Sequence, residues 1–257
     1  MEKQFVGGIP LITLEKEDEE YCKFQQEIYE DVFEAYWKCL RKFQLVLKKR
    51  KMANEKGEKI DVQNENIEKI KRSIKENKEE FIKNVVIYFQ NKHGVRFNLD
   101  QILEKYKDTR VTYFDITEDI YWQLGGLSFK EKAEQQIKED VKNDYTLKNI
   151  QVIGNKILIK DYINISQDQL TMDSRPKLLE FMRALSNFED GNIRMSAPFL
   201  GVLKAVQGDG KFKPIEIKAN KVVVGLCLYK DNRIKIRFAT EEKAREFAKE
   251  YLGVDEE

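Results

Sequence analysis

The segment RIKIRF near the carboxyl terminus alternates basic and apolar side chains. Arg233, Lys235 and Arg237 fall on one face of an extended strand, because successive side chains of a strand point to opposite sides. A row of cations at this spacing could contact the phosphates of a nucleic acid. An ordinary solvated sheet face has the same appearance, since the exposed faces of antiparallel sheets are polar by default. The pattern therefore leaves both interpretations open.

A second basic cluster lies at the end of the first long helical segment and consists of Lys48, Lys49, Arg50 and Lys51. Cations are favourable at the C-terminal end of a helix, so a solvated helix tip explains them. Phosphate contact is the alternative. Sheets that bind nucleic acids usually add aromatic side chains on which bases stack. Tyr229 is a candidate for that role, although the charged face of RIKIRF itself carries no aromatic residue.

Residues that could carry catalysis or bind a metal are sparse. His93 is the only histidine, which excludes sites that need two or more, and its place at a helix end favours a structural role. No P-loop, dinucleotide-binding glycine motif or GxSxG motif occurs. Acidic pairs such as Asp115 and Asp119 arise readily by chance among 45 acidic residues. We expect no catalytic residue, no metal site and no cofactor, and keep a carboxylate enzyme that uses a metal as a third alternative.

The composition indicates a soluble intracellular protein. The 257 residues include 46 Lys and Arg against 45 Asp and Glu, for a net charge of +1, so any nucleic-acid contact needs a local patch. Cys22, Cys39 and Cys227 are widely spaced and form no CxxC motif, which argues against a disulfide framework or a zinc site and fits a reducing cytosol. No apolar run reaches the ~20 residues of a membrane span, and no signal peptide is recognised. We expect a cytoplasmic protein without membrane contact.

The first half of the chain is predicted to be helical. Residues 18–51 carry apolar side chains at three- and four-residue steps, the period of a helix with one buried face. Residues 63–92 repeat the pattern after a loop that Asn54 and Gly57 indicate. These segments predict an antiparallel hairpin of long helices with a basic tip.

Two shorter segments follow the hairpin. RVTYFDI, residues 110–116, is predicted as a strand or an extended linker. TEDIYWQLGG then predicts a short helix that ends at Gly125 and Gly126.

The strands are predicted in the second half. IQVIGNKILIKDYI predicts a hairpin that turns at Gly154-Asn155. IEIKANKVVVGLCLYKDNRIKIRF predicts three strands, of which residues 222–229 are apolar on both faces and should be central. The turns are expected near 219–220 and 231–232. With this pairing, Glu216 and Lys218 share a face with the basic row.

Capping signals place the helices of the second half. SFKE predicts a helix that starts after Ser128 and runs to about Asn143. RPKLLEFMRALSNFEDG predicts a helix that ends at Gly191, and APFLGVLKAV a short one. Thr240 is the expected N-cap of a final amphipathic helix that Gly253 ends.

These elements predict the α+β class, with a long N-terminal helical hairpin packed with a small C-terminal antiparallel sheet plus helices. We assign residues 1–110 to a helical region and residues 111–257 to a mixed region.

The second half resembles a domain-of-unknown-function family of phage, prophage and plasmid proteins, some of them fused to DNA adenine methyltransferase-like domains. Three segments carry the resemblance: ENIEKIKRSIKENKEEFIKNVVIYF, VIGNKILIKDYI and LCLYKDNRIKIRFATEEKAREF. It covers about residues 61–252. Lys235 stands where the family usually has a histidine, and Arg233 where its turn has an asparagine. The resemblance implies a mobile-element setting in a bacterial host cell, and implies no reaction.

Two functional hypotheses follow. The first is a non-enzymatic phage or mobile-element protein that binds and modulates a host defence or nucleic-acid-processing protein. The alternative is a DNA- or RNA-binding accessory protein that uses the two basic clusters. An apolar patch on the surface would favour the first, and strong salt dependence of binding the second.

Overall fold

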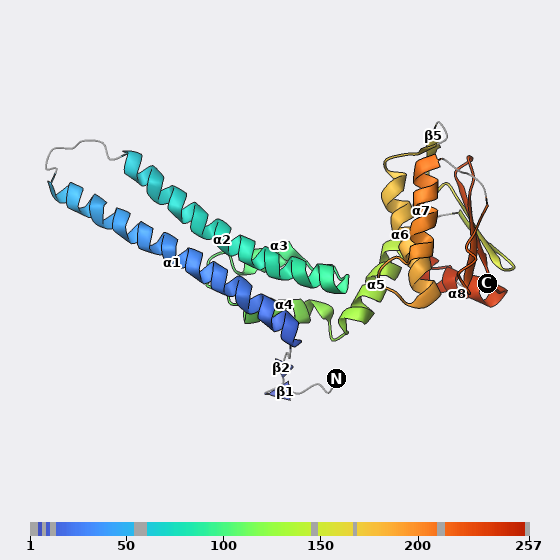
Figure 1. The fold of residues 1–257 in the computed structure, drawn as a ribbon, viewed down its shortest axis with the longest axis horizontal. Coiled ribbons are helices and arrows are strands. Elements are labelled where there is room, and N and C mark those ends of the chain that lie inside the picture. The colour runs from blue at the N-terminus through green and yellow to red at the C-terminus, as the bar shows by residue number, and fades with distance from the viewer. Residues whose placement is uncertain are drawn as a thin grey trace. The chain divides into compact units, whose positions relative to one another are not determined.

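The computed structural model describes residues 5–6, 9–10, 14–53, 61–144, 149–166, 169–209 and 214–254. The chain divides into two compact units, Met1–Leu127 and Ser128–Glu257, and each is described by itself. The predicted α+β class is confirmed, with long helices in the first unit and a small antiparallel sheet in the second (Figure 1).

The first unit is built on two long helices that lie side by side (Figure 1). Its elements are β1 (Phe5–Val6), β2 (Ile9–Pro10), α1 (Lys16–Ala53), α2 (Asp61–His93), α3 (Leu99–Lys105) and α4 (Tyr113–Leu124). The predicted helical hairpin is therefore confirmed. The loop of its expected basic tip, residues 54–60, lies outside the described residues.

Residues 110–112 of the segment RVTYFDI precede α4 and are not helical, whereas residues 113–116 form its first turn. The prediction of a strand or extended linker was therefore wrong for residues 113–116. Thr112 adopts an extended conformation and forms a reciprocal capping box with Asp115, from which α4 starts at Tyr113. The capping bonds satisfy backbone donors at the start of the helix, so the chain becomes helical directly after the β-branched residues Val111 and Thr112. α4 packs against α1 and α2, and the first unit accordingly extends beyond residue 110.

The second unit combines four helices with strands. Its elements are α5 (Phe129–Lys142), β3 (Asn149–Ile153), β4 (Lys156–Lys160), β5 (Ile165–Ser166), β6 (Gln169–Leu170), α6 (Ser174–Asp190), α7 (Ala197–Asp209), β7 (Ile215–Glu216), β8 (Val223–Leu228), β9 (Arg233–Phe238) and α8 (Glu241–Leu252). The predicted caps are confirmed: Ser128 forms a capping box with Glu131, Thr240 caps α8, and Gly191 and Gly253 end α6 and α8 in the left-handed conformation.

Among the described residues, five strands form the main sheet in the order β3-β4-β9-β8-β7, with every neighbouring pair antiparallel. The predicted hairpin at Gly154-Asn155 is confirmed, and its turn requires the positive φ of 53° at Gly154. β8 is an interior strand, but the middle strand is β9 and not the segment 222–229. The order differs because β9 also pairs with β4, some 75 residues earlier in the chain.

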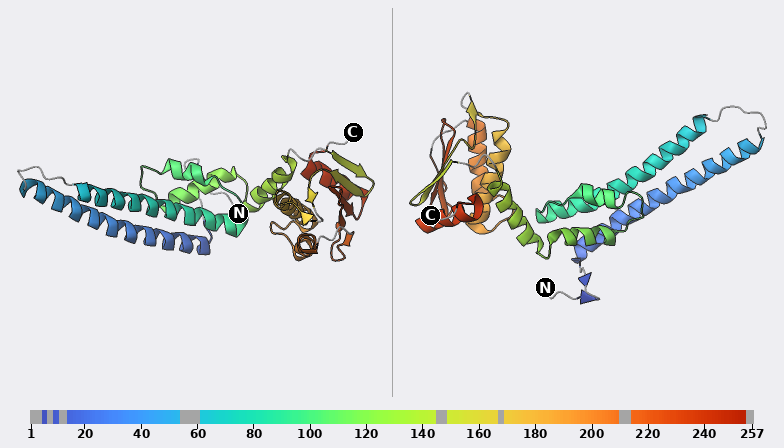
Figure 2. Two further views of the ribbon diagram at one scale, coloured as in Figure 1. Left: turned by 90° about the horizontal axis from the view of Figure 1, so that it is seen from above. Right: turned by 180° about the vertical axis from the view of Figure 1, so that it is seen from behind.

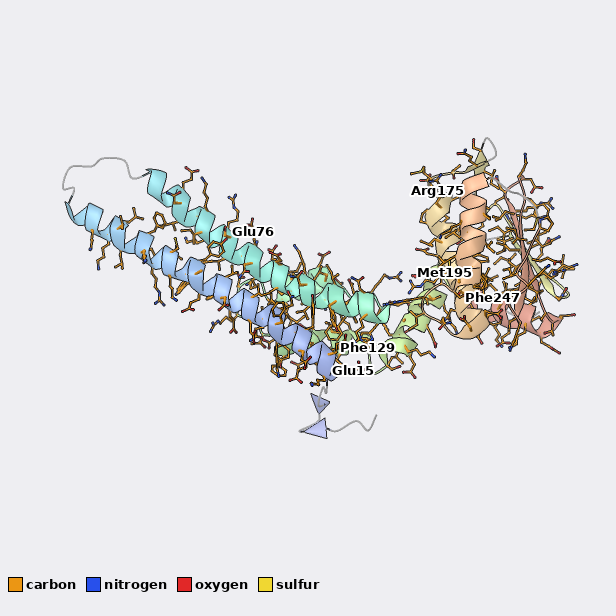
Figure 3. All side chains as sticks on the ribbon, in the orientation of Figure 1. Glu15, Glu76, Phe129, Arg175, Met195 and Phe247 are labelled. Atoms are coloured by element: carbon orange, nitrogen blue, oxygen red, sulfur yellow. The ribbon has the colours of Figure 1, made fainter. Side chains whose placement is uncertain are left out.

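Helices cover one face of this sheet (Figure 2). The alternate residues Ile157, Ile159, Ile234, Ile236 and Phe238 are fully buried against them. Phe247 of α8 is central to this core, where its ring lies 5.5 Å from that of Phe238 and 6.1 Å from that of Phe181 on α6 (Figure 3). Among the described residues of this unit, no helix lies on the opposite face of the sheet (Figures 1 and 2).

Candidate nucleic-acid interface

The uncovered face of the sheet carries the basic row that the sequence indicated. Burial of Ile234, Ile236 and Phe238 on the helix side forces Arg233, Lys235 and Arg237 of β9 to the other side. Arg237 is exposed, and the other two side chains are partly exposed.

The neighbouring strand β4 adds two cations to this row. Lys156 lies opposite Arg237 and Lys160 lies opposite Arg233, while Leu158 lies opposite Lys235. Opposing residues of neighbouring strands are only about 5 Å apart, so five positive side chains occupy one small area. We call Lys156, Lys160, Arg233, Lys235 and Arg237 the cationic face.

Lys156 and Lys160 are the site residues that sequence reasoning missed. The segment KILIK alternates as RIKIR does, and this was an available signal. Only the β4–β9 register shows that the two rows are adjacent.

Carboxylates neutralise the positive charge of the two arginines of the cationic face. Asp231 Oδ2 lies 2.6 Å from Arg233 Nη2, and Glu216 Oε1 lies 3.4 Å from Arg237 Nη2. The hydrogen bond from Arg233 holds the pKa of the Asp231 carboxyl below its ordinary value. Glu216 thus lies on the basic face as predicted, whereas Lys218 follows the end of β7.

The three lysines differ from the arginines. Among the described residues, no carboxylate lies within 4.0 Å of the Nζ atoms of Lys156, Lys160 or Lys235. Asp161 follows Lys160 in the chain, and its Oδ2 accepts a hydrogen bond from Asn149 Nδ2 at 3.5 Å. The lysines are therefore the part of the cationic face with charge available to a ligand.

Strand β8 shapes the other border of the cationic face. Gly225 lies opposite Arg237, and a Cβ atom at Gly225 would come within 3.4 Å of both Arg237 Nε and the Ile215 carbonyl oxygen. The missing side chain lets Arg237 reach across β8 toward Glu216. At the far end of the strand, the Tyr229 ring lies 4.9 Å from Arg233 Cζ and 5.4 Å from Lys235 Nζ. Tyr229, the candidate aromatic, is thus adjacent to the basic row.

The other predicted basic cluster belongs to the first unit. Lys48 and Lys49 are exposed near the end of α1. The side chains of Arg50 and Lys51 lie outside the described residues. The cluster and the cationic face belong to different units, and each is tested by its own variants.

The environment favours a structural role for the other residues considered for catalysis or metal binding, which are His93, Asp115 and Asp119. His93 is largely buried at the end of α2, its Nε2 lies 3.9 Å from Asp18 Oδ2, and burial lowers its pKa. Asp115 completes the capping box that Thr112 starts at α4, and Asp119 Oδ1 pairs with Lys105 Nζ at 2.6 Å.

Within the described residues, no group of three or more His, Cys, Asp or Glu side chains is arranged to hold a metal ion. None of the helices in the described part of the chain has the length and apolarity that crossing a membrane requires.

Comparisons with known proteins add no relative. No protein-family model matches the chain, and neither a curated protein nor a solved structure matches it. The resemblance to phage, prophage and plasmid proteins stays a prediction.

Proposed function

We propose that the second unit binds nucleic acid through the cationic face. The observation that carries the proposal is the β4–β9 register, which adds Lys156 and Lys160 to the row that contains Lys235. The three lysines lie on a sheet face that no helix of this unit covers, and no carboxylate of the described residues pairs with them. Such a cluster supplies the charge contacts that dominate nucleic-acid affinity.

The proposed contacts go to phosphates. Lysine ammonium groups are point charges that contact phosphate oxygens and carry no sequence information by themselves. Arg233 and Arg237 already engage Asp231 and Glu216, and the lysines therefore provide most of the attraction. The proposed activity is binding and requires no catalytic residue or cofactor.

The salt dependence of binding tests this proposal. With about three phosphate contacts on a single strand, the logarithm of the binding constant should fall with the logarithm of salt concentration with a slope of about −2. Affinity for a fluorescein-labelled 12-nucleotide strand should drop roughly 20-fold between 50 and 200 mM salt, measured by fluorescence anisotropy. Absence of binding at 50 mM, or affinity that does not change with salt, would contradict the proposal.

Binding of a host protein, as a phage or mobile-element protein would do, is the second candidate function. It is supported by apolar side chains on the surface of α1, where Phe24 is 57% exposed and Ile28 is 44% exposed. They lie four residues apart and so share one helix face. A bacterial protein that this chain captures after nuclease treatment and at high salt would support this function over nucleic-acid binding.

A further inference from the structure

A tight hairpin fixes the aromatic residue at the end of the cationic face. The Tyr229 N–H donates to the Arg233 carbonyl oxygen at 2.8 Å, and the Asn232 N–H donates to the Tyr229 carbonyl oxygen at 3.1 Å. Asn232 has a φ of 65°, as three-residue hairpin loops require. Asn232 also bonds the body of the unit, because its Oδ1 accepts from the Ile165 N–H at 2.9 Å. The backbone beneath Tyr229 and Arg233 is therefore held from both sides.

The Arg233 side chain is fixed as well. Its guanidinium lies over the Tyr229 ring and bonds the Asp231 carboxylate. Its Nε is buried and has no acceptor among the described residues. Even so, 39% of the side chain stays exposed. An arginine held in this way offers a planar surface and little uncompensated charge.

We propose that Tyr229 and Arg233 form a stacking platform for an unpaired base, which makes single-stranded nucleic acid the substrate class of the cationic face; this rests on the proposed function. Aromatic rings and guanidinium planes are the surfaces on which proteins stack splayed bases. Lys235 borders the same ring, so a phosphate next to the stacked base meets an available cation. Bases inside a duplex are paired and stacked on their neighbours, so they are not available to such a platform.

The test compares a labelled 12-nucleotide pyrimidine strand with a blunt duplex of the same length by fluorescence anisotropy. Tyr229→Leu should weaken single-strand binding about 5- to 150-fold, the range for loss of one stacked base. The salt slope should stay unchanged, and duplex binding should change little. Tyr229→Phe keeps the ring and should keep the affinity. Asp231→Asn should lower the ratio of single-strand to duplex affinity, because it releases the guanidinium.

The outcomes separate the two proposals. If Tyr229→Leu binds the single strand as wild type does, or if it weakens single-strand and duplex binding equally, the platform is contradicted while binding by the lysines stands. If wild type binds neither probe at 50 mM salt, the proposed function fails and the platform fails with it. Circular dichroism of each variant shows whether its fold is intact, and Tyr229→Phe provides the matched control.

Discussion

Replacing Lys156, Lys160 and Lys235 together by glutamine should weaken binding to a single-stranded oligonucleotide by at least about 30-fold at 50 mM salt. Each lost phosphate contact removes roughly half to one power of ten under these conditions. The slope against salt should also fall from about −2 toward zero, because it counts the released counterions. Fluorescence anisotropy at several salt concentrations measures both quantities. Stability should change little, since the described residues give these lysines no ion pair.

A matched variant controls for the change in net charge. The control replaces one lysine on each of α5, α7 and α8, which are Lys132, Lys204 and Lys249. These helices do not lie on the side of the sheet that carries the cationic face. Replacement of the three lysines by glutamine alters the net charge by the same amount. This control should bind within about 3-fold of wild type, because exposed charges farther than a Debye length are screened. Equal loss in both variants would show that the cationic face is not the site.

Replacing Glu189 by alanine should lower the free energy of unfolding of the second unit by about 2–4 kcal/mol. The Glu189 carboxylate, at the end of α6, accepts hydrogen bonds from three successive backbone N–H groups at the start of β8. The distances are 2.7 Å to Lys221, 3.0 Å to Val222 and 2.7 Å to Val223. Hydrogen bonds to a charged acceptor contribute about 1.5–3 kcal/mol each, and water replaces part of that where the amides become exposed.

Hydrogen exchange is the suitable measurement because it reports on the second unit alone. Peptides from β8 and β9 should lose protection in Glu189→Ala. Glu180 is an exposed residue of the same helix, and Glu180→Ala should cost less than about 0.5 kcal/mol. If the two variants unfold at the same free energy, the carboxylate does not hold β8 to α6.

Helix positions could be predicted from the sequence because their signals are local. A helix start is indicated within four residues by the pair Ser128 and Glu131, and a second one by Thr240. A helix end is indicated by Gly191. The prediction for residues 113–116 was wrong for an equally local reason. The capping box of α4 uses Asp115 in place of the usual glutamate or glutamine, so the β-branched residues before it dominated the prediction.

The candidate site could be predicted only in part. Alternation showed that Arg233, Lys235 and Arg237 share a face, and the apolar alternate residues showed which side is buried. The contribution of Lys156 and Lys160 depends on which strand pairs with β9. That choice is made by packing between segments some 75 residues apart, and no local signal reports it.

Lysine footprinting reports directly which lysines contact the bound oligonucleotide. The full chain is acetylated briefly with and without a saturating 12-nucleotide single strand, and mass spectrometry measures the labelling rate of each lysine. The oligonucleotide should slow labelling of Lys156, Lys160 and Lys235 and leave labelling of Lys132, Lys204 and Lys249 unchanged. Protection confined to Lys48, Lys49 and Lys51, or protection of no lysine while the oligonucleotide is bound, would contradict binding at the cationic face.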